Sequence, residues 1–385
     1  MPHEAVATAI SLAPAIHEVR TETEAQRRLP ESIVAALVES NLFRLALPSD
    51  LGGLELDPVV ALQVYEELAK AEAAAAWVVW NSALPCLFGR FLSGTARQEV
   101  FGNTSGKYAS STRPTGGAVT ENGHYRLSGR WSLVSGCMHA DWIGLMHMVM
   151  KDGEVEMLAP GAPNMRMAFV PKAACEIVDT WHVGGLRGTG SHDVVVDDMV
   201  VSAEMTFSPM EPSHLDRPIG RVPIACTMSA GLAAICLGIA QAAVDAVVSL
   251  GLTKVTVDAV PDLRDRSPNQ ILVATAGARI DAFRRVLHGT LGNLWRLAES
   301  GAEWTAEDIA DVWAASTTTA RECRSLVTDM YEVAGSSALY TDCTLERCHR
   351  DIHAALQHIV VQPVWLEEAG RVKLGLEPTN PLFGL

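Results

Sequence analysis

The first hundred residues alternate between hydrophobic runs of helical spacing and short polar breaks. Pro30-Glu31-Ser32 precedes the apolar run 33–38, and proline suits the first turn of a helix. Asp57-Pro58 is a second helix start, and the following pattern predicts one helix over residues 59–80. Residues 47–53 include Pro48 and two glycines and form a predicted loop. We therefore expect an N-terminal helical domain over residues 1–104.

The pattern changes from helical spacing to strand alternation after this domain. Asn122-Gly123 is the dipeptide typical of a tight hairpin turn, and residues 124–131 then alternate roughly as a strand does. Residues 194–201 are rich in β-branched side chains and fit another strand. We expect a β domain over residues 105–213.

Long helical segments make up the rest of the chain, at residues 222–250, 268–299, 305–334 and 345–371. Helices of this length predict an antiparallel four-helix bundle over residues 214–385. The first segment is long and apolar enough to suggest a membrane span. It contains Gln241 and Asp245 and has no flanking Lys or Arg cluster, which favours a helix buried in a bundle or subunit interface. The predicted fold class is α+β.

Composition narrows the possible partners. The chain has 385 residues, 48% of them hydrophobic, and a formal net charge of −15. An acidic chain without a basic stripe is a poor candidate for binding nucleic acid or an anionic membrane. Its eight cysteines lack paired CxxC spacing, and Met1-Pro2-His3-Glu4 lacks the basic region of a signal peptide. We expect a reduced, cytoplasmic compartment.

Three motifs follow one another along the chain. They are Gly129-Arg130-Trp131-Ser132-Leu133-Val134-Ser135-Gly136, then the glycine-rich stretch Trp181–Asp193, then Arg347-Cys348-His349-Arg350-Asp351. Together they resemble the acyl-CoA dehydrogenase superfamily over nearly the whole chain, and the loop at residues 47–53 matches the same pattern. The resemblance implies a flavin between the β domain and the bundle, usually in a homotetramer.

The resemblance also implies which residues face the flavin. Trp131 and Ser135 match positions that line its ring, because a hydroxyl can bond the ring edge while an indole packs on its face. The alternative is that Trp131 belongs to the core and Ser135 only closes a turn. The other expected cofactor-binding residues are Ser110, Ser111, Thr112 and Arg266.

The glycine-rich stretch contains Gly184-Gly185 and Gly188-Thr189-Gly190. It precedes a strand, whereas a dinucleotide fingerprint follows a strand and opens a helix. We expect turns braced by Arg187, with Asp193 in a capping or salt-bridging role. Contact with the flavin or with a neighbouring subunit is the alternative.

A histidine cluster lies in the last predicted helix. His349 and His353 are four residues apart with Cys343 and Cys348 nearby, which leaves a metal site as one interpretation. There is no HExxH motif, and the Arg350-Asp351 pair resembles the superfamily's structural pair that ties the bundle together. We therefore expect no metal.

The same region separates two activities within the superfamily. The resemblance would place a dehydrogenase's catalytic glutamate near His358-Ile359, and isoleucine cannot abstract a proton. A histidine here instead resembles the two-component flavin monooxygenases, which take reduced flavin from a separate NAD(P)H-dependent reductase. That resemblance implies reduced FAD, with FMN possible, and oxygen transfer through a flavin C4a-hydroperoxide. The alternatives are an acyl-CoA dehydrogenase with a relocated base, or an N- or S-oxygenase of the same fold.

Within the monooxygenase interpretation, particular side chains are assigned roles. Ser135 is the candidate to hold the flavin N5 proton, and His358, followed by His353, is the candidate acid or base with a near-neutral pKa. Trp77, Trp80 and Asn81 are candidates for the substrate pocket. Related hydroxylases often carry another histidine after the first of these tryptophans, and its absence here argues against a simple phenol. We expect a small aromatic or heteroaromatic substrate, either an indole-type or a polycyclic molecule.

Overall fold

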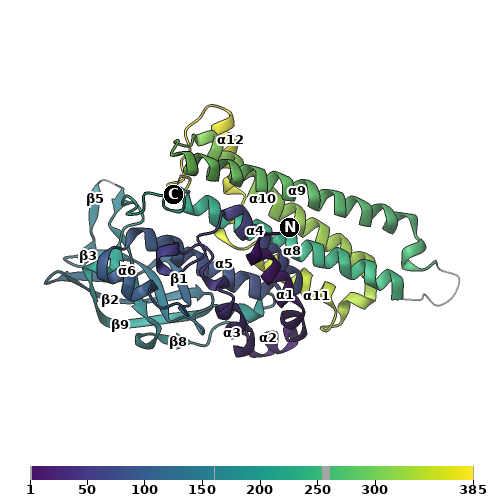
Figure 1. The fold of residues 1–385 in the computed structure, drawn as a ribbon, viewed down its shortest axis with the longest axis horizontal. Helices are drawn as coiled ribbons and strands as arrows, with labels where there is room; N and C mark the ends of the chain where they lie inside the picture. The colour runs from purple at the N-terminus through teal and green to yellow at the C-terminus, as the bar shows by residue number, and fades with distance from the viewer. Residues whose placement is uncertain (1, 160, 254–260, 385) are drawn as a thin grey trace.

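The computed structural model describes residues 2–159, 161–253 and 261–384, so Met1 and Leu385, at the ends of the predicted domains, lie outside the described residues. The predicted order of helices, β sheet and helix bundle is confirmed (Figure 1). The chain passes from helix to strand between Phe101 and Tyr108, and from strand back to helix between Phe207 and Pro218.

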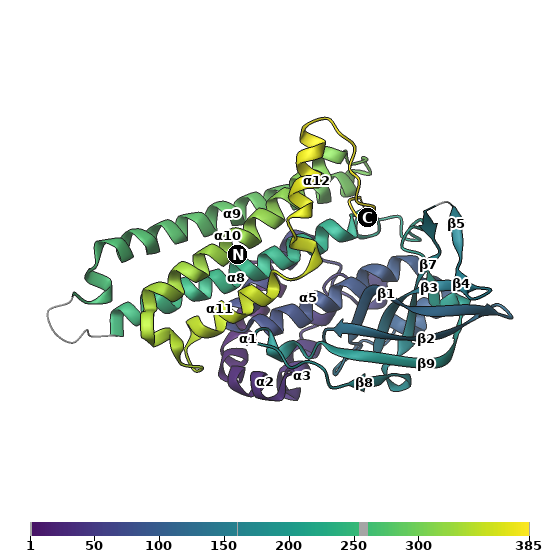
Figure 2. The same cartoon turned by 180° about the vertical axis from the view of Figure 1, so that it is seen from behind.

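Among the N-terminal helices, α5 (Ala73–Phe88) packs between the sheet and the bundle, because it contacts both β1 (Tyr108–Glu121) and α8 (Ile224–Thr253) (Figure 2). The predicted helix over residues 59–80 is wrong in one respect, because it is two helices separated at Glu72, whose backbone is extended. The Glu72 carboxylate accepts the amide of Ala74 at 3.2 Å and so caps the second helix. The elements are α1 (Glu4–Glu18), α2 (Arg20–Gln26), α3 (Glu31–Glu39), α4 (Pro58–Ala71), α5 (Ala73–Phe88) and α6 (Gly94–Phe101).

The β domain is a mostly antiparallel sheet in the order β10-β7-β3-β1-β2-β9-β8, in which only the β1–β3 pair among the neighbours in this order is parallel. The predicted hairpin is confirmed, since Asn122 and Gly123 both have positive φ between β1 and β2. The main strands are β1 (Tyr108–Glu121), β2 (His124–Val134), β3 (Trp142–Lys151), β7 (Met165–Pro171), β8 (Glu176–Val178), β9 (His192–Ser202) and β10 (Thr206–Phe207). The short strands are β4 (Glu154–Val155), β5 (Met157–Ala159) and β6 (Ala162–Pro163).

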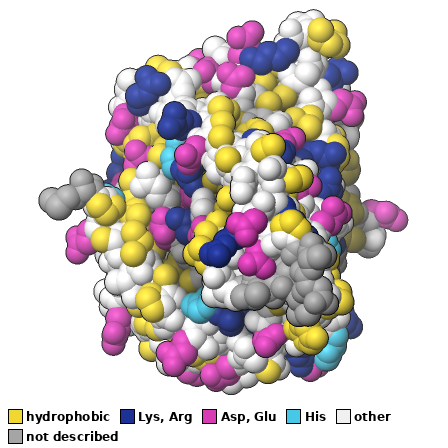
Figure 3. Space-filling view, turned by 90° about the vertical axis from the view of Figure 1, so that its right-hand side faces the viewer, with side chains coloured by type: hydrophobic (Ala, Val, Ile, Leu, Met, Phe, Trp, Pro, Cys, Tyr) yellow, Lys and Arg dark blue, Asp and Glu magenta, His cyan; other side chains and the backbone are white. Residues whose placement is uncertain are grey.

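The C-terminal bundle is built around α8, which contacts α4, α9, α10 and α11. This helix is long and apolar enough to cross a membrane, yet 78% of its most hydrophobic window is buried inside the protein, as a bundle core requires. Seen from the bundle end, acidic, basic and hydrophobic side chains are interspersed (Figure 3). The helices are α7 (Pro218–Arg221), α8 (Ile224–Thr253), α9 (Ser267–Ser300), α10 (Ala306–Ala334), α11 (Thr344–Ala355) and α12 (Val364–Lys373).

The predicted fourth helix over residues 345–371 is wrong, because it is interrupted between α11 and α12. His358 is extended, and a short 3-10 turn, η9 (Ile359–Val361), follows it. Two features of the sequence explain the break: β-branched residues fill η9, and Pro363 disfavours helical geometry at Gln362. The break is fixed in place by the Gln362 side chain, which donates to the Leu356 carbonyl at 2.7 Å.

The Arg350-Asp351 pair joins α11 to the glycine-rich loop of the β domain. The Leu186 amide donates to Asp351 Oδ1 at 2.6 Å, and the Arg350 guanidinium donates to the Gly184 carbonyl. Arg187, which was expected to brace the loop, has a buried Nε without a hydrogen-bond partner among the described residues. The hydrogen bonds that hold the loop to the bundle are those of Asp351 and Arg350.

This contact predicts a difference between adjacent glycines. A Cβ on Gly185 would lie 2.2 Å from the Arg350 carbonyl oxygen, whereas a Cβ on Gly184 meets nothing within 4 Å. We expect Gly185→Ala to lower the free energy of unfolding by about 1–3 kcal/mol, because helix and loop must separate. Gly184→Ala is the matched control and should remain near wild type. Denaturant unfolding measures both, and equal values for the two variants would contradict the account.

Candidate active site

One face of α5 forms one side of the candidate site. Nearly every side chain of α5 is buried, and only Asn81 and Leu84 are half-buried. They lie four and seven residues after Trp77, so the three share one face of the helix. Solvent therefore reaches α5 along this face, where the predicted substrate residues Trp77 and Asn81 lie together.

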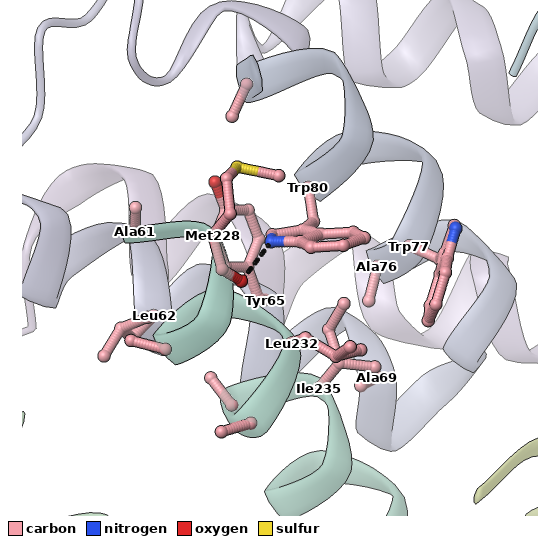
Figure 4. Packing of buried hydrophobic residues seen from close by; sticks show 14 of the residues in the cluster. Ala61, Leu62, Tyr65, Ala69, Ala76, Trp77, Trp80, Met228, Leu232 and Ile235 are labelled. Atoms are coloured by element: carbon pink, nitrogen blue, oxygen red, sulfur yellow. Dashed lines mark hydrogen bonds between the residues drawn. The ribbon is translucent and has the colours of Figure 1, made fainter. Parts of the chain in front are cut away.

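The imidazole of His358 contacts the indoles of Trp77 and Trp80 on α5. The ring of His358 lies 5.6 Å from the ring of Trp77 and 5.3 Å from that of Trp80, both in edge-to-face geometry. Trp80 is fixed because its indole N–H donates to the Met228 carbonyl of α8 at 3.1 Å (Figure 4). The predicted grouping of Trp77, Trp80 and His358 is therefore present in the structure. Flat aromatic surfaces arranged this way suit another aromatic molecule.

His358 owes its position to the break between α11 and α12. The Ser229 hydroxyl of α8 donates to the Val360 carbonyl at 2.7 Å, which holds η9 against the bundle. The Val360 amide donates to His358 Nδ1 at 3.4 Å, so the ring proton of the neutral imidazole lies on Nε2. Nε2 is consequently the ring atom that remains for a ligand.

The expected near-neutral pKa of His358 is wrong. Desolvation by burial, with a smaller contribution from the positive charge of Arg113, lowers the pKa of His358 to about 4. The imidazole is therefore neutral around pH 7 and acts as an N–H donor there, since it is a weak base. Sequence reasoning did not identify Arg113, which the β1 strand brings toward His358.

Ser135 lies in the turn that ends β2, directly beside α5. Its hydroxyl accepts the indole N–H of Trp77 at 3.0 Å and lies 2.7 Å from the hydroxyl of Ser191. Ser191 in turn lies 2.7 Å from Thr189, so three hydroxyls are linked in series. Thr189 and Ser191 were not predicted individually, although the Thr-Gly-Ser spacing within the glycine-rich motif was the available signal.

The serines of β1 provide further hydroxyls. Ser110 and Ser111 are buried, whereas Thr112 is exposed. Ser111 Oγ accepts the Arg113 amide at 3.4 Å, but the buried Ser110 Oγ has no hydrogen-bond partner among the described residues. A buried hydroxyl without a partner is costly unless a ligand satisfies it, so these residues fit a polar ring edge such as that of a flavin.

Other predicted site residues lie elsewhere. Trp131 is fully buried in the core of the sheet, with its indole N–H donating to the Met146 carbonyl at 2.6 Å, so the expected flavin contact is wrong and the core alternative holds. His353 is exposed on α11, packed against His349 at 4.7 Å, and is not brought to His358. Arg266 immediately precedes α9, and its side chain donates to the Pro261 carbonyl at 2.9 Å. Asp193 forms the expected salt bridge, with Arg130 at 2.7 Å.

The fold and this arrangement define a class of protein. Residues 6–99 and 230–363 match the family models of the N-terminal and C-terminal domains of acyl-CoA dehydrogenase. The chain is 30% identical to indole-3-acetate monooxygenase of Acinetobacter baumannii over 93% of this chain and 90% of the relative. It is 30% identical to the oxygenase subunit HsaA, a flavin-dependent monooxygenase of Rhodococcus jostii, over 92% and 93% of the two chains.

The solved structure of XiaF from Streptomyces, in complex with FADH2 and glycerol, superposes with a TM-score of 0.91, 26% identity, and coverage of 98% and 96% of the two chains. The chain therefore belongs to the acyl-CoA dehydrogenase superfamily. Within it, the chain belongs to the two-component, flavin-dependent monooxygenases.

The low pKa of His358 predicts a pH-dependent stability. Below about pH 6.5 the histidine of the unfolded chain gains a proton that the folded protein does not accept until about pH 4. The free energy of unfolding therefore decreases as the pH is lowered through that window. When the pH is lowered from about 7.5 to about 5, we expect the free energy of unfolding of His358→Gln to decrease by roughly 1–2 kcal/mol less than that of the wild type. His353→Gln, on the exposed face of α11, is the control and should keep most of the wild-type slope. Denaturant unfolding of the flavin-free protein measures this, and identical slopes for wild type and His358→Gln would contradict it.

Proposed function

We propose that this chain is the oxygenase component of a two-component monooxygenase that hydroxylates a small aromatic or heteroaromatic molecule of indole type or polycyclic. One observation carries the proposal: the hydroxyl of Ser135 is bonded to the indole of Trp77, which is itself in contact with His358. A polar position for a flavin edge and an aromatic wall for a substrate thus adjoin each other. The relative named for indole-3-acetate supports this substrate class, and the relative named as a flavin-dependent oxygenase subunit supports the reaction type.

The cofactor we propose is reduced FAD, with FMN as the other candidate. When bound, a reduced flavin supplies the electrons that let molecular oxygen donate one atom to a substrate. Ser110, Ser111 and Ser135 would hold the polar edge of its ring, since Ser135 is bonded to Trp77 of α5 and the β1 strand that carries Ser110 and Ser111 packs against the same helix. The similarity to a structure with bound FADH2 favours FAD.

The protein's own residues have distinct roles in this proposal. Trp77 packs against the substrate and excludes water, and the almost fully buried Trp80 supports the rings of Trp77 and His358 from the bundle side. His358 holds a proton on Nε2 beside that aromatic surface at neutral pH. Asn81 adds a polar atom, since its buried Oδ1 has no hydrogen-bond partner among the described residues. Ile359 stands where the dehydrogenase alternative requires a carboxylate, and it is exposed.

The assembly and compartment also belong to the proposal. We propose a homotetramer, supported by exposed hydrophobic side chains on the bundle such as Leu252 and Ile271. We propose a separate NAD(P)H-dependent flavin reductase, because the relative HsaA is named as an oxygenase subunit. A cytoplasmic location is supported by the eight free cysteines, all of which the structure describes.

Ser135→Ala tests the flavin-facing role of this hydroxyl. Without the hydroxyl, the ring edge loses one hydrogen bond of roughly 1 kcal/mol, about a fivefold effect. We expect at least that increase in the ratio of hydrogen peroxide released to product hydroxylated, measured with chemically reduced FAD and oxygen. Thermal unfolding serves as the control for folding. Unchanged coupling of oxygen consumption to product would reject the role of Ser135.

His358→Gln tests the proton held beside the substrate. Glutamine keeps polarity and approximate size but not the imidazole, so product formation should fall about 100-fold or more while flavin affinity stays within a few-fold of wild type. His353→Gln, on the outer face of α11, should keep near-wild-type turnover. Single-turnover product yield and flavin titration provide the two readouts. Wild-type turnover in His358→Gln would remove this residue from the chemistry.

A further inference from the structure

The three linked hydroxyls beside α5 form a chain with two fixed ends. At one end the indole N–H of Trp77 donates to Ser135 Oγ at 3.0 Å, and an indole nitrogen cannot accept. At the other end Thr189 Oγ1 donates to the Leu186 carbonyl oxygen at 2.9 Å, which also accepts the Thr189 amide at 3.1 Å and the Trp181 indole N–H at 3.2 Å, and a carbonyl cannot donate. Ser191 stands between them, at 2.7 Å from each of the other two hydroxyls.

These ends determine where each hydroxyl proton lies. Thr189 must give its single proton to the Leu186 carbonyl, because two oxygens at this distance repel each other without a proton between them. Ser191 must then give its proton to Thr189, and Ser135 must give its proton to Ser191. The Ser135 oxygen accepts from Trp77 and has donated its own proton. It consequently has one lone pair, and no proton, to offer a ligand.

The surroundings keep the chain in this state. Thr189, Ser191 and Ser135 are each no more than 5% exposed, so water has little access to supply other partners. The Gly136 amide donates to the Thr189 carbonyl at 2.9 Å and binds the two turns together. The Leu186 amide donates to Asp351 at 2.6 Å, which holds the backbone at Leu186, whose carbonyl accepts the Thr189 proton.

We infer that Thr189 and Ser191 are positioning residues that hold Ser135 as a hydrogen-bond acceptor, so that the site selects reduced over oxidised flavin. N5 of a reduced flavin carries a proton and donates, whereas N5 of an oxidised flavin has only a lone pair. An acceptor on Ser135 matches the first and opposes the second. The inference rests on the proposed function, and it adds to that function a means of taking up the reduced cofactor and releasing the oxidised one.

Thr189→Val and Thr189→Ser together distinguish the effect of the Thr189 hydroxyl from the effect of the side chain's shape. Valine has nearly the shape of threonine but cannot accept the Ser191 proton. Ser191 then donates to Ser135, and the Ser135 proton turns toward the ligand, so the preference reverses. Thr189→Ser keeps the hydroxyl and is the matched control. Ser191→Ala is a second variant, because it also frees the Ser135 proton.

The experiment measures the dissociation constants of oxidised FAD in air and of chemically reduced FAD without oxygen, for wild type and each variant. We expect Thr189→Val and Ser191→Ala to weaken reduced FAD and tighten oxidised FAD, changing the ratio of the two constants about tenfold or more. A tenfold change corresponds to a bound-flavin potential about 30 mV more negative. Thr189→Ser should keep the wild-type ratio.

Opposite shifts of the two affinities are a result that a merely structural role for Thr189 would not produce. Equal weakening of both forms in Thr189→Val and Ser191→Ala would overturn the inference, as would an unchanged ratio. Wild-type protein that binds neither form would instead overturn the proposed function. The two failures are thus distinguishable in the same titrations.

Discussion

The hydrogen bond from the Leu186 amide to Asp351 is the link on which the site depends. Asp351 belongs to α11 of the bundle and Leu186 to the loop before β9 of the sheet, so the contact joins the bundle to the β domain. From Leu186 the connection continues through Thr189 and Ser191 to Ser135 and ends at Trp77 on α5. Bundle, sheet and N-terminal helices are therefore held together at the place where the cofactor and substrate are proposed to meet.

A second constraint is the interruption of the last long helix. An uninterrupted helix would continue the face of α11 on which His353 is exposed. The extended backbone at His358 instead directs this ring against Trp77 and Trp80, where desolvation keeps it neutral. Irregular backbone thus places the histidine, and the regular helices on either side anchor it.

Local signals in the sequence predicted local structure well. The Asp57 cap and the Asn122-Gly123 turn depend on neighbouring residues, so both were predictable. The side taken by Trp131 was not, because it alternates in phase with the buried Leu127, and the strand pattern alone does not say which face of the sheet is packed. The Ser135–Ser191 contact joins positions 56 residues apart and depends on tertiary packing. The break at His358 required weighing Pro363 against otherwise helical spacing.

The central claim is that this site transfers an oxygen atom from molecular oxygen to an aromatic molecule when given reduced flavin. The most direct measurement supplies chemically reduced FAD, oxygen-18 gas and a panel of indoles and polycyclic aromatics, without any reductase, and analyses the products by mass spectrometry. The account predicts a product that carries one oxygen-18 atom. Absence of labelled product, together with bleaching of bound oxidised flavin by an acyl-CoA without oxygen, would contradict it and identify a dehydrogenase.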